Sequence, residues 1–188
     1  MTKKPLEKTV ILAMFAAVSV VLVYFVHFPI FPEAAYLEYD PADVMIFLAS
    51  MLISPVSSVV LTVVVAFVQG MLVSGFNLGI IMHIVATGTA AFVCGSIYRK
   101  RKAPLTAIIA LAAAAIIATA VMIPMNYLLT PIYMDVPRNV VAALLVFPIG
   151  TFNLVKFGIN ALITGILLKP VSLALSKSGA ISTDTRGN

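Results

Sequence analysis

The side chain with the most unusual setting in this sequence is Lys156, which lies in the middle of a long apolar run. Asn153 and Asn160 flank it at i−3 and i+4, so the three side chains project from one side of a helix. A lysine at bilayer depth costs about 2.5–3.5 kcal/mol on insertion scales and normally faces a polar interior or a transport pathway. This cluster indicates a ligand site, and the alternative is a helix-packing pair with a snorkelling lysine.

Other polar side chains are expected near Lys156 in one half of a helical bundle. Asn126 lies near the end of one apolar run, and Asn77 precedes another, in which His83 and Thr87 follow at i, i+4 spacing. Amides and a lysine together offer donors and acceptors that suit a planar heterocycle or a polyol. His83 by itself is more typical of a packed histidine that is hydrogen-bonded within a bundle. Stacking surface is expected from several aromatic residues, namely Tyr36, Tyr39, Phe31, Phe76 and Tyr127.

The motifs of the common enzyme classes are missing from the sequence. It has no phosphate-binding loop, no H-E-x-x-H, no G-x-S-x-G and no pair of carboxylates within one apolar run. The only cysteine, Cys94, can form neither an internal disulfide nor a thiolate metal site. We therefore predict a binding subunit without cofactor, driven by partner proteins, and not an enzyme.

The amino-acid composition indicates a membrane protein. Of its 188 residues 62% are apolar and 10% charged, and the mean hydropathy is +1.12, which excludes an ordinary soluble domain. This length holds about six spans of roughly 20 residues each. We predict an all-α membrane protein, with one six-transmembrane-helix bundle over residues 1–175 and a polar, disordered tail over residues 176–188.

Apolar length and the positions of Pro and Gly place the expected helices. The stretch 43–74 is broken at Ser54-Pro55 and should form two helices, one of them short. A loop containing Pro131 should lead into a short apolar stretch at 140–147. The remaining spans are expected at about residues 9–28, 78–98, 104–129 and 150–175.

The distribution of charge predicts the topology, because Lys and Arg accumulate on the cytoplasmic side. With both termini inside, ten of the twelve basic residues lie at the cytoplasmic face, and five of the seven acids lie outside. The net charge of +5 therefore reports topology and does not indicate nucleic-acid binding. The basic block at residues 99–102 is also expected to touch anionic membrane lipid.

Ala13 and Ala17 form a small-xxx-small pair on one face of the first expected helix. Such a face lets another helix approach closely, since packing drives helix association in lipid. It serves either packing inside the bundle or docking to a separate membrane subunit.

Four segments in a fixed order resemble the substrate-binding S components of energy-coupling factor (ECF) vitamin transporters, and within that family the riboflavin-specific group. They are residues 36–43 (YLEYDPAD), residues 82–100 (MHIVATGTAAFVCGSIYRK), Asn126-Tyr127 followed by Pro131 and Tyr133, and residues 152–156 (FNLVK). The resemblance spans nearly the whole chain. It implies a six-helix bundle in a prokaryotic plasma membrane, whose first external loop covers a pocket for the isoalloxazine ring and ribityl chain of riboflavin.

The resemblance also implies roles for individual residues. Asn126, Asn153 and Lys156 would hydrogen-bond the flavin ring, and Tyr39 and Asp40 would belong to the covering loop. The pocket wall would include Ala86, Thr87 and Gly88. Ala13 and Ala17 would face the transmembrane coupling protein, which works with two cytoplasmic ATPases.

This chain departs from the riboflavin-specific group at two positions, because Ala42 and Met45 stand where the group has serine and proline. Another flavin or another small heterocycle therefore remains open as the ligand. A stand-alone secondary transporter of a small heterocyclic vitamin remains the alternative function, although no inverted repeat of discontinuous helices is apparent.

Overall fold

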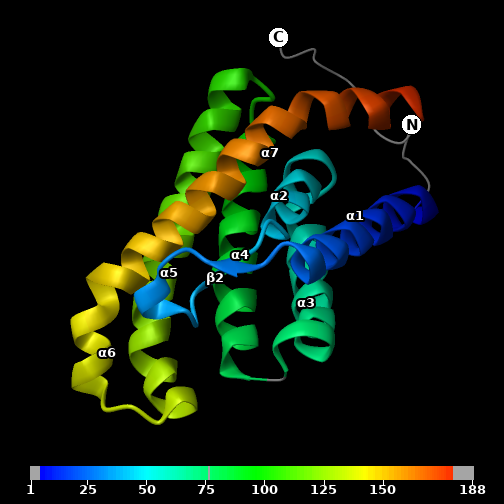
Figure 1. Ribbon diagram of the computed structural model, residues 1–188. Helices are drawn as coiled ribbons and strands as arrows, with labels where there is room; N and C mark the ends of the chain where they lie inside the picture. The colour runs from blue at the N-terminus through cyan, green and yellow to red at the C-terminus, as the bar shows by residue number, and fades with distance from the viewer. Residues whose placement is uncertain (1–4, 76, 180–188) are drawn as a thin grey trace.

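The computed structural model describes residues 5–75 and 77–179, and most of these residues are helical (Figure 1). The long helices are α1 (Pro5–Phe25), α3 (Pro55–Gln69), α4 (Leu78–Tyr98), α5 (Pro104–Met134) and α7 (Thr151–Lys177). Two shorter helices are α2 (Asp43–Leu52) and α6 (Arg138–Leu144). A π-helical turn follows α3 at Gly70–Ser74, and another joins α6 to α7 at Leu145–Gly150.

The expected all-α membrane bundle is confirmed. Five helical segments of the described chain are long and apolar enough to cross a membrane: Leu6–Phe25, Pro55–Leu72, Leu78–Tyr98, Pro104–Met134 and Arg138–Lys177. The sixth helix of the bundle, α2, has 10 residues and is only about 15 Å long. The break at Ser54-Pro55 separates α2 from α3 as predicted, and the Ser54 hydroxyl caps α3 by accepting the Ser57 N–H at 3.4 Å.

Helix α2 lies inside the bundle, in contact with α1, α3, α4 and α7. Every residue from Asp43 to Met51 is buried, as expected for a helix that is apolar on nearly all sides. It approaches α4 closely at Gly95, beside Ser50, whose hydroxyl donates a hydrogen bond to the Ala91 carbonyl. A short central helix therefore organises the packing of the longer ones.

The ends of α1 and α5 differ from the sequence prediction. Helix α1 ends at Phe25, before the expected residue 28. Helix α5 continues through Pro124 and Pro131 to Met134, so Pro131 lies in a helix and not in the predicted loop. Membrane helices tolerate proline, because neighbouring groups satisfy the carbonyls that it frees. Asp135, which adopts the left-handed conformation at φ 52°, ends α5.

At its C-terminal end the chain remains helical slightly further than expected. Helix α7 extends to Lys177, two residues beyond the predicted limit of the bundle. The predicted disordered tail falls mostly on residues 180–188, which lie outside the described residues.

The connection between α1 and α2, residues 26–42, passes in front of α4 in Figure 1 and turns back toward α2. We call it the α1–α2 loop. It contains the 3₁₀ turn η1 (Pro32–Ala34) and two short antiparallel strands, β1 (Phe28–Pro29) and β2 (Glu38–Tyr39). A small apolar cluster holds its tip against α6, the following π-helical turn and the start of α7; the cluster consists of Ala34, Leu37, Val141, Ile149 and Phe152.

The two ends of the bundle differ in their connections. The α4–α5 connection, which carries the basic block at residues 99–102, lies at the same end as the C-terminal end of α7 (Figure 1). The α3–α4 and α5–α6 connections lie at the opposite end. The basic block and the C-terminal end of α7 therefore lie at one end of the bundle.

The close approach of α2 and α4 leads to a stability prediction. A Cβ atom at residue 95 would lie 2.6 Å from the Ser50 carbonyl oxygen, whereas one at Gly158 would meet nothing within 4 Å. Gly95→Ala should therefore destabilise the bundle by about 1–3 kcal/mol through overpacking, measured as a lower thermal unfolding temperature in detergent. Gly158→Ala is the matched control and should leave that temperature unchanged or slightly raised. Equal unfolding temperatures for the two variants would contradict the close approach.

Candidate functional site

A cavity of about 330 Å³ lies beneath the α1–α2 loop, within the size range of small-molecule sites. Its wall includes residues from the loop and from α1, α3, α4, α5 and α7. It lies toward the end of the bundle that carries the α3–α4 and α5–α6 connections, since Asn77, Gly79 and Tyr133 line it. The polar lining residues are His27, Tyr36, Glu38, Asp40, Gln69, Asn77, His83, Asn126, Tyr133, Asn153 and Lys156.

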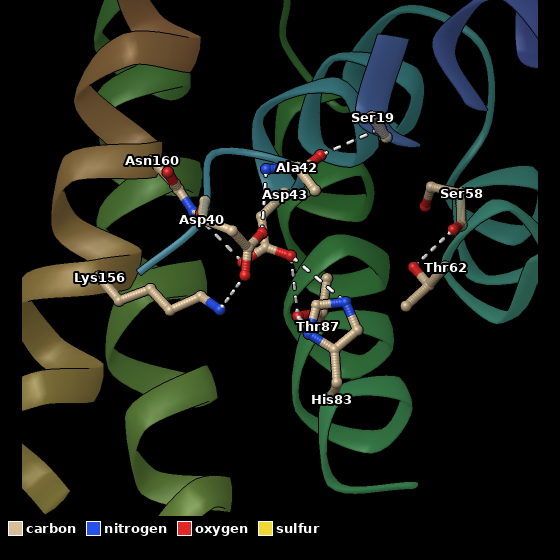
Figure 2. A network of polar contacts seen from close by, with 10 residues as sticks. All are labelled: Ser19, Asp40, Ala42, Asp43, Ser58, Thr62, His83, Thr87, Lys156 and Asn160. Atoms are coloured by element: carbon tan, nitrogen blue, oxygen red, sulfur yellow. Dashed lines mark hydrogen bonds and ion pairs between the residues drawn. The ribbon is translucent and has the colours of Figure 1, made fainter. Parts of the chain in front are cut away.

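Lys156 points from α7 toward the α1–α2 loop, where it meets Asp40 (Figure 2). Its Nζ donates a hydrogen bond of 2.7 Å to Asp40 Oδ2, and both side chains are buried. A buried charge is costly unless it is paired, and removing one partner of such a pair costs about 3–5 kcal/mol. The ion pair therefore joins α7 to the covering loop at the cavity wall.

Asp40, in the loop, is held in its charged form. Burial by itself raises the pKa of this carboxyl group. The Lys156 ammonium and the hydrogen bonds from Lys156 and the Ala42 N–H lower the pKa by more than burial raises it. The resulting pKa lies below the ordinary value of an aspartate. The loop side of the ion pair is therefore a carboxylate.

Asn160, one helical turn after Lys156, makes three bonds to the segment that joins the loop to α2. Its Oδ1 accepts from the Tyr39 hydroxyl at 3.0 Å, and its Nδ2 donates to the Asp40 carbonyl at 3.1 Å and to Asp43 Oδ2 at 3.3 Å. The side chain is fully buried and does not line the cavity. Asn160 thus fixes the loop from behind the cavity wall.

Asp43, the first residue of α2, also contacts α4 (Figure 2). Its Oδ1 accepts from the Thr87 hydroxyl at 3.1 Å and lies 3.7 Å from His83 Nε2. His83 Nδ1 lies 3.5 Å from the same hydroxyl. One polar network therefore runs from α7 through the start of α2 to α4, and it includes His83, which also lines the cavity.

Two further asparagines line the cavity. Asn126 Nδ2 donates to the Met122 carbonyl, and its Oδ1 accepts from Thr130. Asn153 Nδ2 donates to the Ile149 carbonyl at 2.8 Å. Within the described part of the chain, one N–H of each amide and the Oδ1 of Asn153 make no hydrogen bond to protein, so they are available to a ligand.

The structure separates the sequence-predicted site residues into two groups. Six of them line the cavity: Asp40, Asn77, Ala86, Asn126, Asn153 and Lys156. The other three lie outside the lining: Tyr39 bonds Asn160, Thr87 bonds Asp43, and Gly88 faces Val59 of α3. Buried Tyr39 and Thr87 therefore support the wall from behind.

Aromatic residues contribute to the cavity differently from the expectation. Tyr36 lines it, whereas Phe31 packs on Phe147 and Tyr127 is exposed. Phe76 lies outside the described residues. The rings that complete the wall, Tyr133, Phe152 and Phe157, were not predicted to do so.

Sequence reasoning also gave no site role to His27 and Met122, which line the cavity. His27 was an available signal, because it is a polar residue just after the first apolar run. Met122 had no such signal, because it lies in an apolar run and only helix packing orients it toward the cavity.

Ala13 and Ala17 lie on the exposed side of α1, while Ile11 and Phe15 of the same helix belong to the apolar core. Internal packing of the bundle therefore does not use the small-residue face. It remains free for contact with lipid or with another helix.

Comparison with known proteins identifies the family. The sequence model of the family described as "ECF transporter, substrate-specific component" matches residues 7–168. The solved structure of the S component of a bacterial ECF transporter is similar at a TM-score of 0.78, covering 92% of this chain and 99% of that chain at 22% sequence identity. At that identity the likeness shows the fold alone. A comparison with curated proteins found no match.

Proteins of this family bind the substrate of a transporter, carry no cofactor and associate with an energy-coupling module of a coupling protein and ATPases. They are not enzymes. Because the family match covers most of its length, this chain belongs to the substrate-specific (S) components of ECF transporters, the membrane-embedded substrate-binding subunits of these importers.

Proposed function

We propose that this S component binds riboflavin, or a closely related flavin, from the exterior of a prokaryotic cell and delivers it to the energy-coupling module. The observation that carries the proposal is that Lys156, Asn126 and Asn153 line the same 330 Å³ cavity. These are the residues that the resemblance to the riboflavin-specific group assigns to the flavin ring.

The hydrogen-bonding capacity of this wall suits the pyrimidine edge of a flavin. That edge carries two carbonyl oxygens on either side of an imide N–H. The Lys156 ammonium has three donors, and Asp40 uses one of them, so two can reach ligand oxygens. The free Oδ1 of Asn153 can accept the imide N–H, and its second amide hydrogen can donate to a neighbouring carbonyl.

The apolar part of the wall suits a flat ring system. Tyr36, Tyr133, Phe152 and Phe157 line the same cavity as the polar residues. Aromatic side chains contribute large contact areas and stack at their faces or edges. A tricyclic isoalloxazine ring would bury more of its surface here than a small polyol could.

The two residues that depart from the riboflavin-specific pattern do not line the cavity. Ala42 and Met45 are buried, and neither lines the cavity. The backbone of Ala42 is held on both sides, because its carbonyl accepts from Ser19 and its N–H donates to Asp40. We therefore attribute these changes to the attachment of the loop and not to the choice of ligand.

Riboflavin binding to the purified protein tests the function. Isothermal titration calorimetry should detect one saturable site in the parent. The double variant Lys156→Met/Asp40→Asn removes both charges of the ion pair, and we expect it to bind about 10- to 100-fold more weakly, because a hydrogen bond to a charged group contributes about 1.5–3 kcal/mol.

Lys169→Met is the control, since Lys169 is an exposed lysine of the same helix, and its binding should equal that of the parent. Absence of saturable binding by the parent would refute riboflavin as the ligand. Parent-like affinity of the double variant would instead refute the role of Lys156.

The proposed direction of transport requires the cavity end of the bundle to face outward and both termini to face the cytoplasm. Cys94, the only cysteine of the sequence, is buried, so an introduced exposed cysteine should be the reactive thiol. A membrane-impermeant maleimide added to intact cells should label Asn139→Cys in α6 and spare Lys102→Cys in the α4–α5 connection. After the cells are opened both should be labelled, and the reverse pattern in intact cells would invert the topology.

The exposed small-residue face of α1 is the proposed contact with the coupling protein. Ala17→Leu should lower ATP-driven riboflavin uptake about tenfold or more, corresponding to ~1.4 kcal/mol of lost association, because the larger side chain prevents close helix approach. Riboflavin binding by the isolated variant should be unchanged. Ala112→Leu, at an exposed alanine of α5, should retain uptake. Normal uptake by Ala13→Leu and Ala17→Leu would exclude this face as the contact.

A further inference from the structure

We infer that Asn160 is a positioning residue that holds the α1–α2 loop closed over the cavity and thereby sets how long a ligand stays bound. This inference rests on the proposed function only where it concerns riboflavin. The part that concerns the loop rests on the geometry of the ligand-free protein.

All the loop-directed bonds of Asn160 fall within five consecutive residues, 39–43. The amide accepts from the Tyr39 hydroxyl at 3.0 Å and donates to the Asp40 carbonyl at 3.1 Å and to the Asp43 carboxyl group at 3.3 Å. The residue is fully buried and does not line the cavity. It therefore acts on a ligand only through the loop.

The chemistry of this position requires an amide. A leucine of similar size could neither accept from Tyr39 nor donate to Asp40 and Asp43. An aspartate could accept from Tyr39, but it has no N–H to donate and would bring a third carboxyl group beside Asp40 and Asp43. An asparagine supplies the acceptor and both donors from one short side chain.

Asn160 and Lys156 bind different groups of Asp40. Lys156 holds the carboxylate of Asp40, and Asn160 holds its backbone carbonyl (Figure 2). Because Lys156 lines the cavity and Asn160 does not, replacing Lys156 changes ligand contacts and loop attachment together. Replacing Asn160 changes the attachment of the loop and of the start of α2 without removing a residue from the cavity wall.

Thr164 provides a matched control on the same helix. It lies one turn after Asn160, is also fully buried, and its hydroxyl donates to the Asn160 carbonyl within α7. Thr164→Val removes a buried hydrogen bond without removing a contact to the loop. A general loss of stability would therefore appear in both Thr164→Val and Asn160→Leu. Opening of the loop would appear only in Asn160→Leu.

Hydrogen exchange of the ligand-free protein, followed by mass spectrometry in lipid nanodiscs, tests the loop directly. In Asn160→Leu we expect amides of residues 34–42 to exchange about tenfold faster or more, since all three hydrogen bonds of this amide to residues 39–43 are lost. Peptides of α4 and α5 should exchange as in the parent and in Thr164→Val. Unchanged exchange in the loop, or faster exchange through the whole bundle, would overturn the inference.

A second variant keeps the inference testable if Asn160→Leu does not fold. Tyr39→Phe removes one hydroxyl and one of the three bonds, so its loop should exchange faster than the parent loop. Where Asn160→Leu also folds, its loop should exchange faster still, and the double variant should not exceed it, because Tyr39 and Asn160 contribute one shared bond. A Tyr39→Phe loop that exchanges like the parent loop would show that this bond does not hold it.

Riboflavin dissociation, followed by its recovered fluorescence, measures the consequence for the ligand. Asn160→Leu should release riboflavin about tenfold faster or more, with a small change in the association rate. An unchanged dissociation rate would refute the link to residence time. If the parent does not bind riboflavin at all, the proposed function fails, while the exchange experiment still decides the role of Asn160.

Discussion

The structure depends on how an apolar bundle accommodates charge at its centre. Lys156 lies on a helix that lipid and apolar side chains otherwise surround, and its ammonium is tolerated there because Asp40 faces it at 2.7 Å. Asp40 comes from the α1–α2 loop, more than a hundred residues away in sequence. The same interaction that neutralises the lysine therefore draws the loop across the bundle and encloses the cavity.

The short helix α2 explains why the loop arrives where it does. Asp43 is the first residue of α2, and the helix is buried from there to Met51. Since Asn160 of α7 and Thr87 of α4 both bond the Asp43 carboxyl group, the start of α2 has a fixed place between these two helices. The preceding residues, Tyr39 and Asp40, must then pass close to α7, where Lys156 and Asn160 hold them.

Polar residues of this bundle fall into two layers with different tasks. One layer faces the cavity and keeps hydrogen-bonding groups free, as Asn153 and Lys156 do. The other layer lies behind it: Tyr39 and Asn160 bond each other, and Thr87 bonds Asp43 at the start of α2. In an S component, the first layer would select the substrate and the second would preserve the shape in which selection occurs.

The sequence by itself determined the membrane class, most helix positions, the break at Ser54-Pro55 and the shared helix face of Asn153 and Lys156, because apolar length, proline and a charge in an apolar run are local signals. Only the tertiary structure decided that Asp40 neutralises Lys156, that Asn160 holds the loop and that Thr87 lies behind the cavity wall. Local pattern also misplaced the end of α5, since Pro131 remains helical there. The physical reason is that a local pattern shows which side chains share a helix face, whereas the choice of partner depends on which distant segments packing brings within hydrogen-bond distance.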